Sequence, residues 1–174
     1  MVVGEGSGAL VLESAEHAQA RGAPVLATLA GWARSFLDPN SDQFGDALAA
    51  NYQASINNAS LQAQDIDCVN AHASGSLIYD QIEATAIKNV LADKPVVAHK
   101  GNFGNIGPGT SIVELIGGVL AKQNGLIPKS INCDQVDPKC AINVVDSNLA
   151  IETSATLLKS SFSATGQIAS IVIR

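Results

Sequence analysis

The stretch "VVAHKGNFGNIGPGTSIVELIGG", residues 96–118, decides the fold. It begins with a β-branched apolar run that is typical of a strand, continues through a glycine-rich loop, and ends in an apolar helical pattern. A helix that is apolar on nearly every side must be covered by other elements. We therefore expect this helix at the centre of a layered structure, with the strand and the loop leading into it.

The rest of the chain repeats the same alternation of strands and helices. We expect strands at residues 8–14, 24–33, 65–73 and 94–100, helices at residues 14–22, 41–59, 80–92 and 109–125, and a C-terminal hairpin formed by "ATLLKSSFS" and "IASIVIR". The predicted order is β-α-β-α-β-α-β-α-β-β. Such alternation favours a layered α/β fold, and no repeat or linker divides residues 1–174, so a single domain is expected.

Composition narrows the functional classes. The chain has 174 residues, of which 47% are hydrophobic and 15% charged, and its net charge is −6. These values favour a packed globular protein, and the acidic balance argues against nucleic-acid and anionic-membrane binding. No signal peptide and no apolar run long enough to span a bilayer are found. The three cysteines have no metal-ligand spacing, so we expect reduced thiols and a cytoplasmic location.

His72 is the first candidate for chemistry, because it closes an apolar strand and precedes a loop of small residues. Chemistry in α/β proteins is often placed at strand ends, although a single histidine there is more often structural. Asp80 and Glu83 follow at the expected start of a helix. Their Asp-x-x-Glu spacing favours a capping box, and the alternative is that Glu83 pairs with a nearby cation.

Lys100 stands before the glycines of the opening stretch. A phosphate-binding loop has its lysine after the glycines, so this is a different kind of loop. Apolar flanks make Lys100 a candidate for burial, which requires a carboxylate partner, and Glu83 is the nearest by topology. His99 should point to the opposite face of the strand.

Several segments together resemble the C-terminal half of β-ketoacyl synthases, over nearly the whole chain. They are "GEGSGALVLESAEHAQARG", "NAHASGSLIYDQIE", "KGNFGNIGPGTSIVELIGG" and "INCDQVDPKC", in the order and spacing of that family. The resemblance implies a thiolase-like half, with a five-stranded mixed sheet covered by helices. It also implies decarboxylative Claisen condensation in fatty-acid or polyketide synthesis.

The resemblance also implies partners. The substrates would be carried on the phosphopantetheine arm of an acyl carrier protein, with no separate cofactor and no metal in catalysis. The catalytic cysteine of the family lies in the N-terminal half, so this chain should be inactive alone and should act with that half, as a homodimer or heterodimer. The chain starts inside a family motif, which favours a piece of a longer protein. Cys68, Cys133 and Cys140 match no nucleophile position, and we expect all three to be structural.

Site residues follow from the positions that match the family's motifs. His72 matches the first of two basic residues that stabilise an enolate, Lys100 matches the lysine, and Glu83 matches its ion-pair partner. Asn105 stands where the second histidine is common, and an amide donates a hydrogen bond but carries no proton. Ser74 and Phe162 match positions that the family uses in substrate binding.

Other positions depart from the family. Ala164 and Thr165 alter its gating turn. Many members also hold a small structural cation. Asn70 and Glu114 match two of its ligands, but Lys159 and Ile168 occupy other ligand positions. Lys159 could place its ammonium where that ion would sit, although an exposed lysine on an edge strand is the favoured interpretation.

Two functional classes remain open at this stage. The chain is either the C-terminal part of a condensing acyltransferase or part of a non-catalytic homologue, such as a chain-length-factor-like partner subunit. Asn105 and the altered turn favour the second, whereas His72, Lys100 and Glu83 favour the first. A stand-alone binding module is the least favoured, because half of a two-lobed fold would leave an apolar face open.

Overall fold

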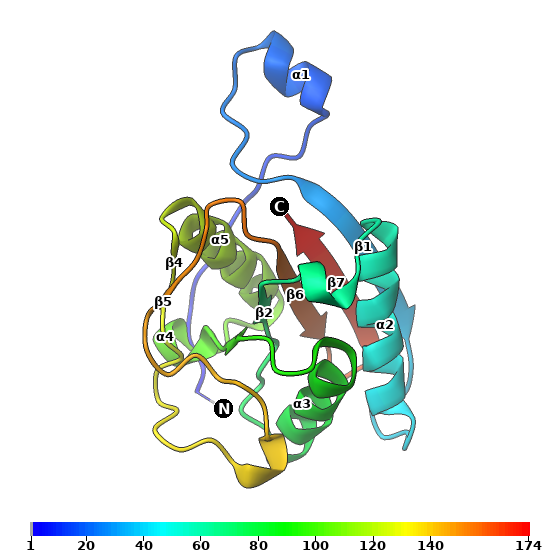
Figure 1. Cartoon of the computed structure of the whole chain (residues 1–174). Coiled ribbons are helices and arrows are strands. Elements are labelled where there is room, and N and C mark those ends of the chain that lie inside the picture. The colour runs from blue at the N-terminus through cyan, green and yellow to red at the C-terminus, as the bar shows by residue number, and fades with distance from the viewer. Residues whose placement is uncertain (1) are drawn as a thin grey trace.

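A five-stranded mixed sheet forms the centre of the computed structural model, which describes residues 2–174 (Figure 1). Its strand order is β1 (Leu29–Phe36), β7 (Gln167–Ile173), β6 (Leu157–Phe162), β2 (Cys68–Asn70) and β3 (Val96–Val97). β7 is antiparallel to β1 and β6, whereas β2 is parallel to β6 and β3. The predicted sheet and its C-terminal hairpin are confirmed.

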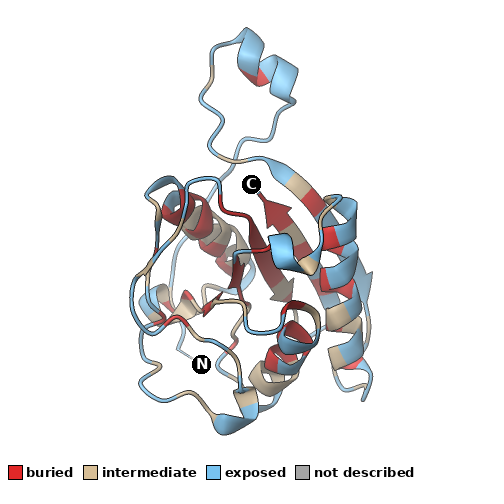
Figure 2. Ribbon diagram, viewed as in Figure 1, coloured by how far each residue is buried: buried red, intermediate tan, exposed pale blue. Residues whose placement is uncertain are grey.

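Helices cover both faces of this sheet. Side chains of β6 alternate between the faces, as the two-residue period of a strand requires. Leu158 and Phe162 pack into a core with α2 (Phe44–Asn58) and α3 (Leu77–Leu91), and Leu157 packs into a second core with α5 (Thr110–Gln123). Buried residues accordingly gather in the sheet and on the inward sides of the helices (Figure 2). The three long helices lie close to their predicted positions.

Shorter elements complete the chain. They are α1 (Ala15–Ala20), α4 (Lys100–Phe103), the two-stranded sheet of β4 (Leu126–Ile127) and β5 (Leu149–Ala150), and the 3-10 turns η1 (Ala63–Asp65), η2 (Gly107–Gly109) and η3 (Pro138–Cys140). Within residues 2–174, no helix is long and apolar enough to cross a membrane.

The predictions of the first two strands are wrong: one strand is absent and the other begins later in the sequence. Residues 8–14 form no strand, because a strand needs a hydrogen-bonded neighbour and this exposed segment leads away from the sheet toward α1 (Figure 1). The second strand begins at Leu29 rather than at residue 24. α1 itself has its predicted caps: Ser14 Oγ accepts from the His17 amide, and Gly22 has φ of +68°.

The strand that leads into the opening stretch is also shorter than expected. β3 ends at Val97, and Lys100 opens α4. His99 and Lys100 therefore do not alternate across a strand. His99 is buried, and burial lowers the pKa of its imidazole. Ending the strand early turns Lys100 inward, toward α5, where its ion-pair partner lies.

Close packing of β1 against α2 depends on Gly31. A Cβ at this position would lie 2.4 Å from the Ser55 carbonyl oxygen and 2.5 Å from the Ala59 amide nitrogen, both of which belong to backbone. Backbone atoms cannot rotate away as a side chain can. A side chain here would therefore push α2 off the sheet.

We expect Gly31→Ala to lower the free energy of unfolding by about 1–3 kcal/mol, the usual cost of overpacking. Gly45→Ala is the control: its Cβ would be 3.4 Å from Ile82 Cγ2, an ordinary contact, and alanine favours a helix by up to about 1 kcal/mol. Denaturant titration of both variants provides the measurement. Equal stability of the two variants would contradict this packing.

Candidate active site

A pocket of about 640 Å³ opens beside the carboxyl ends of β2 and β6. His72 reaches it from the turn after β2, Phe162 from the end of β6, and Asn105 from the loop after α4. Ser74, Ser111 and Ser161 also line it. Parallel strands end at the same edge of a sheet, which explains why residues distant in the sequence meet here.

The turn that carries His72 is held by charged side chains. The carboxylate of Glu83 accepts hydrogen bonds from the His72 and Ala73 amides, each at 2.8 Å. Lys100 Nζ donates to the His72 carbonyl oxygen. Ala73 has φ of +44°, a conformation that a residue with a Cβ adopts only at a cost. These charge-assisted contacts stabilise the strained turn and fix the backbone of His72.

Glu83 is fully enclosed and also ties the turn to the sheet. Its Oε1 accepts from the Ser160 hydroxyl at 2.8 Å, and the Ser160 hydroxyl in turn lies 2.8 Å from the Tyr52 hydroxyl. Burial raises the pKa of Glu83, while the three donors favour its charged form. Both sequence hypotheses for Glu83 are therefore wrong: Ser76 caps the helix, and Glu83 binds amides rather than Lys100.

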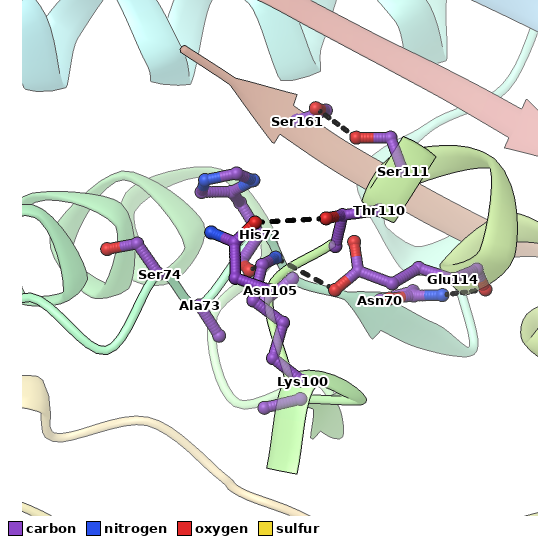
Figure 3. A network of polar contacts seen from close by, with 12 residues as sticks. Asn70, His72, Ala73, Ser74, Lys100, Asn105, Thr110, Ser111, Glu114 and Ser161 are labelled. Carbon is purple, nitrogen blue, oxygen red and sulfur yellow. Dashed lines mark hydrogen bonds and ion pairs between the residues drawn. The ribbon is translucent and has the colours of Figure 1, made fainter. Parts of the chain in front are cut away.

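The partner of Lys100 is Glu114, on α5. Lys100 Nζ lies 2.8 Å from Glu114 Oε1 (Figure 3). The Glu114 side chain is fully buried, and that of Lys100 is 9% exposed. Glu83 was expected to pair with Lys100 because their elements are neighbours in the order along the chain. In space, the two oxygens of Glu83 are taken by the turn, and α5 packs on the other face of the sheet.

Lys159 reaches the same carboxylate from β6. Its Nζ lies 2.8 Å from Glu114 Oε2, and its side chain is only 4% exposed. The favoured interpretation of Lys159 as an exposed lysine on an edge strand is wrong, because β6 pairs with β7 and β2 inside the sheet. Beside Glu114, the ammonium occupies the space that a bound cation would need, so such a cation does not fit this chain.

Electrostatics keep His72 neutral. Its pKa is lowered to about 3, first by burial and then by the charges of Lys100 and Lys159. The ring packs on Phe162, with ring centroids 4.3 Å apart. A neutral imidazole can donate one hydrogen bond, and the lysines that disfavour its protonation also favour an anion in the pocket.

Asn105 lies in the same pocket as His72 (Figure 3). Its Oδ1 accepts from the Gly107 amide at 2.9 Å and lies 3.1 Å from Thr110 Oγ1. Gly107 has φ of +67°, which lets the loop return toward Asn105. These contacts fix the plane of the amide next to the imidazole.

Ser74 and Phe162 both line the pocket as expected. Ser74 Oγ donates to Asp80 Oδ1 at 2.8 Å, so Asp80 holds this loop. The hydroxyls of Ser111 and Ser161, which are 2.6 Å apart, were not predicted from the sequence. The two-residue period of a strand could have indicated the position of Ser161. Leu157, Lys159 and Ser161 must lie on the same face of β6, which is the face that α5 covers.

No cysteine lines this pocket. Cys68 is buried, and burial raises the pKa of its thiol to about 12, which makes it a poor nucleophile. Cys133 and Cys140 are partly exposed and lie elsewhere. Across the described residues, no group of three or more histidines, cysteines or acidic residues could hold a metal ion.

Comparison with known proteins identifies the family of the chain. The family model described as the beta-ketoacyl synthase C-terminal domain matches residues 26–134. The chain belongs to the β-ketoacyl synthase family. Among curated members, it is 37% identical to Nodulation protein E of Rhizobium meliloti and 38% identical to 3-oxoacyl-[acyl-carrier-protein] synthase 2 of Mycobacterium bovis, in each case over 83% of the chain.

Solved β-ketoacyl synthase structures share the thiolase-like fold. The ishigamide ketosynthase/chain length factor superposes with a TM-score of 0.90 at 30% identity, covering 98% of this chain and 43% of that one. A type II polyketide ketosynthase complexed with its acyl-carrier protein, AntDE:AntF, gives a TM-score of 0.85 at 26% identity, covering 93% and 41%. The chain spans 37% and 36% of the two curated relatives.

We expect Glu83→Gln to lower the free energy of unfolding by about 2 kcal/mol, because an amide NH₂ would face one of the two backbone donors. The backbone NMR signals of His72 and Ala73 should shift as well. Glu152→Gln, at an exposed position, is the matched control. Unchanged stability and unchanged signals in Glu83→Gln would contradict the role of this carboxylate.

Proposed function

We propose that this chain forms the C-terminal part of a 3-oxoacyl-[acyl-carrier-protein] synthase that performs decarboxylative Claisen condensation. The observation that carries the proposal is that His72 and Asn105 line one pocket, next to the ion pairs that Lys100 and the buried Lys159 form with Glu114. Neutral donors over a positive field are suited to a reaction whose transition state places negative charge on a thioester oxygen.

Decarboxylation is the step that these residues would assist. The bond between the malonyl carboxylate and the α-carbon breaks, carbon dioxide leaves, and the electron pair enters the α-carbon and thioester carbonyl as an enolate. His72 and Asn105 would donate hydrogen bonds to the enolate oxygen. Lys100 and Lys159 would stabilise its charge through the protein interior, since both lower the pKa of His72 and so disfavour positive charge at this position.

Condensation then requires a thiol from outside the described pocket. The enolate carbon attacks the acyl thioester, a carbon–carbon bond forms, and the thiolate leaves. We assign that thiol to the N-terminal half of the synthase and the malonyl group to an acyl carrier protein. The polyketide ketosynthase structure named above is such a complex with a carrier protein. The free cysteines suit a reducing compartment such as the cytoplasm.

A non-catalytic partner subunit is the second candidate. The neighbour with a TM-score of 0.90 is described as a ketosynthase/chain length factor. The turn at residues 163–167 also favours this candidate, because Ser163, Thr165 and Gln167 close it with side-chain hydrogen bonds. Ala164 faces the pocket where the family has an aromatic gate. Such a turn would shape the wall of a pocket.

Release of carbon dioxide from malonyl-[acyl-carrier protein] by the complete protein tests the proposal. We expect His72→Ala to lower the rate by roughly 10²–10³-fold, the usual effect of removing one oxyanion donor. Asn105→Ala should act in the same direction. His17→Ala is the matched control, because His17 lies on the exposed helix α1 and is 66% exposed.

The two candidates predict different results. A synthase releases carbon dioxide and loses the activity with His72. A partner subunit gives no release from its own pocket, and His72→Ala then changes nothing. Activity that survives His72→Ala at the level of His17→Ala would contradict the proposed role of the imidazole.

A further inference from the structure

The surroundings of the Lys159 ammonium are those of a cation site. Nζ lies 2.8 Å from Glu114 Oε2 and 3.4 Å from the Ala71 carbonyl oxygen, and it also donates to the Ser160 carbonyl oxygen. All of these neighbours are oxygen atoms, from the Glu114 carboxylate, from the residue that follows β2 and from β6. Asn70 is the register partner of Lys159, and its Nδ2 donates to the Glu114 carbonyl oxygen at 2.8 Å.

The charge balance explains why a lysine is tolerated here. Glu114 is completely buried, and a buried carboxylate requires cations close by. Lys100 contacts one of its oxygens and Lys159 the other. Burial lowers the pKa of Lys159, while Glu114 opposes this shift. One carboxylate therefore holds two ammonium groups that come from opposite sides, α4 and β6.

The two lysines also bind consecutive carbonyl oxygens. Lys159 contacts the oxygen of Ala71, and Lys100 contacts the oxygen of His72. Glu83 holds the amides of the same turn. Loss of Lys159 would free the first carbonyl and leave one oxygen of Glu114 without its cation. The backbone that aims His72 would then lose one of its supports.

We propose that the Lys159 ammonium acts as a built-in cation, which replaces a bound metal ion between Glu114 and the end of β2 and positions His72. Lys159 is thus a positioning residue, not a catalytic one. Its effect on catalysis rests on the proposed function, whereas its effect on stability and on the His72 turn does not. The space left by its removal would accept a free monovalent cation of similar size.

Chemical rescue of the complete protein tests this proposal. Lys159→Ala should lower the melting temperature by roughly 5–10 °C, because Glu114 loses a partner. Ammonium or potassium chloride at 200 mM should restore about half of that loss, since a ligand that binds only the folded state stabilises it. Tetramethylammonium chloride at the same ionic strength is too large for the site and should restore nothing.

Controls separate a filled site from general salt effects. Wild-type protein should show no preference for ammonium or potassium over tetramethylammonium. Lys94→Ala is the matched variant, because Lys94 Nζ also donates to a carbonyl oxygen, that of Gln64 at 2.8 Å, but at the surface. It should show no preference either. Equal effects of the three salts on Lys159→Ala would overturn the proposal.

Lys159→Met provides a second measurement if Lys159→Ala does not fold. Methionine keeps most of the volume but cannot bind the oxygens, so the NMR signals of the Ala71 and His72 backbone and of the His72 ring should shift. Carbon dioxide release should fall roughly tenfold through kcat with little change in KM. Unchanged NMR signals would overturn the proposal. Shifted signals without any decarboxylation in wild type would contradict only the proposed function.

Discussion

The packing of α5 against the sheet, and with it the position of the pocket, depends on one buried carboxylate. Glu114 lies on α5 with no exposed surface and binds Lys100 from α4 through one oxygen and Lys159 from β6 through the other. Isolated charges at such depth would be very costly, so the three groups must be kept together. This requirement fixes α5 against the sheet at the point where β2 and β6 end, and the pocket opens at that same point.

The topology of the sheet brings the turn after β2 next to the charged side chains and to Phe162. Because β2 runs parallel to β6, the turn after β2 lies beside Phe162, and the His72 ring packs on that phenylalanine. Glu83 reaches the turn from the opposite layer and binds its amides, while the lysines bind its carbonyl side. Charged groups from both faces of the sheet thus hold one strained turn. The imidazole that results is neutral, and the positive charges of Lys100 and Lys159 act on it.

Features that depend on local sequence pattern could be predicted. The three long helices and the C-terminal hairpin follow from periodicity, and the resemblance placed His72 and Asn105 near each other. Ion-pair partners and burial that are set by tertiary packing could not be predicted in this way. Glu83 was paired with Lys100 because the chain order suggests it, and Lys159 was placed at a surface because strand order cannot be read from one strand. Residues 8–14 have a strand pattern, but no neighbouring strand within the described chain pairs with them.

Amide hydrogen exchange of His72 and Ala73 in the complete protein tests the central claim most directly. The Glu83 carboxylate accepts from both amides, so the two amides should exchange only when the protein unfolds globally, at rates close to those of amides in β6. Exchange at the rates of an exposed loop would show that the turn opens freely. In that case the buried charges would not position the imidazole.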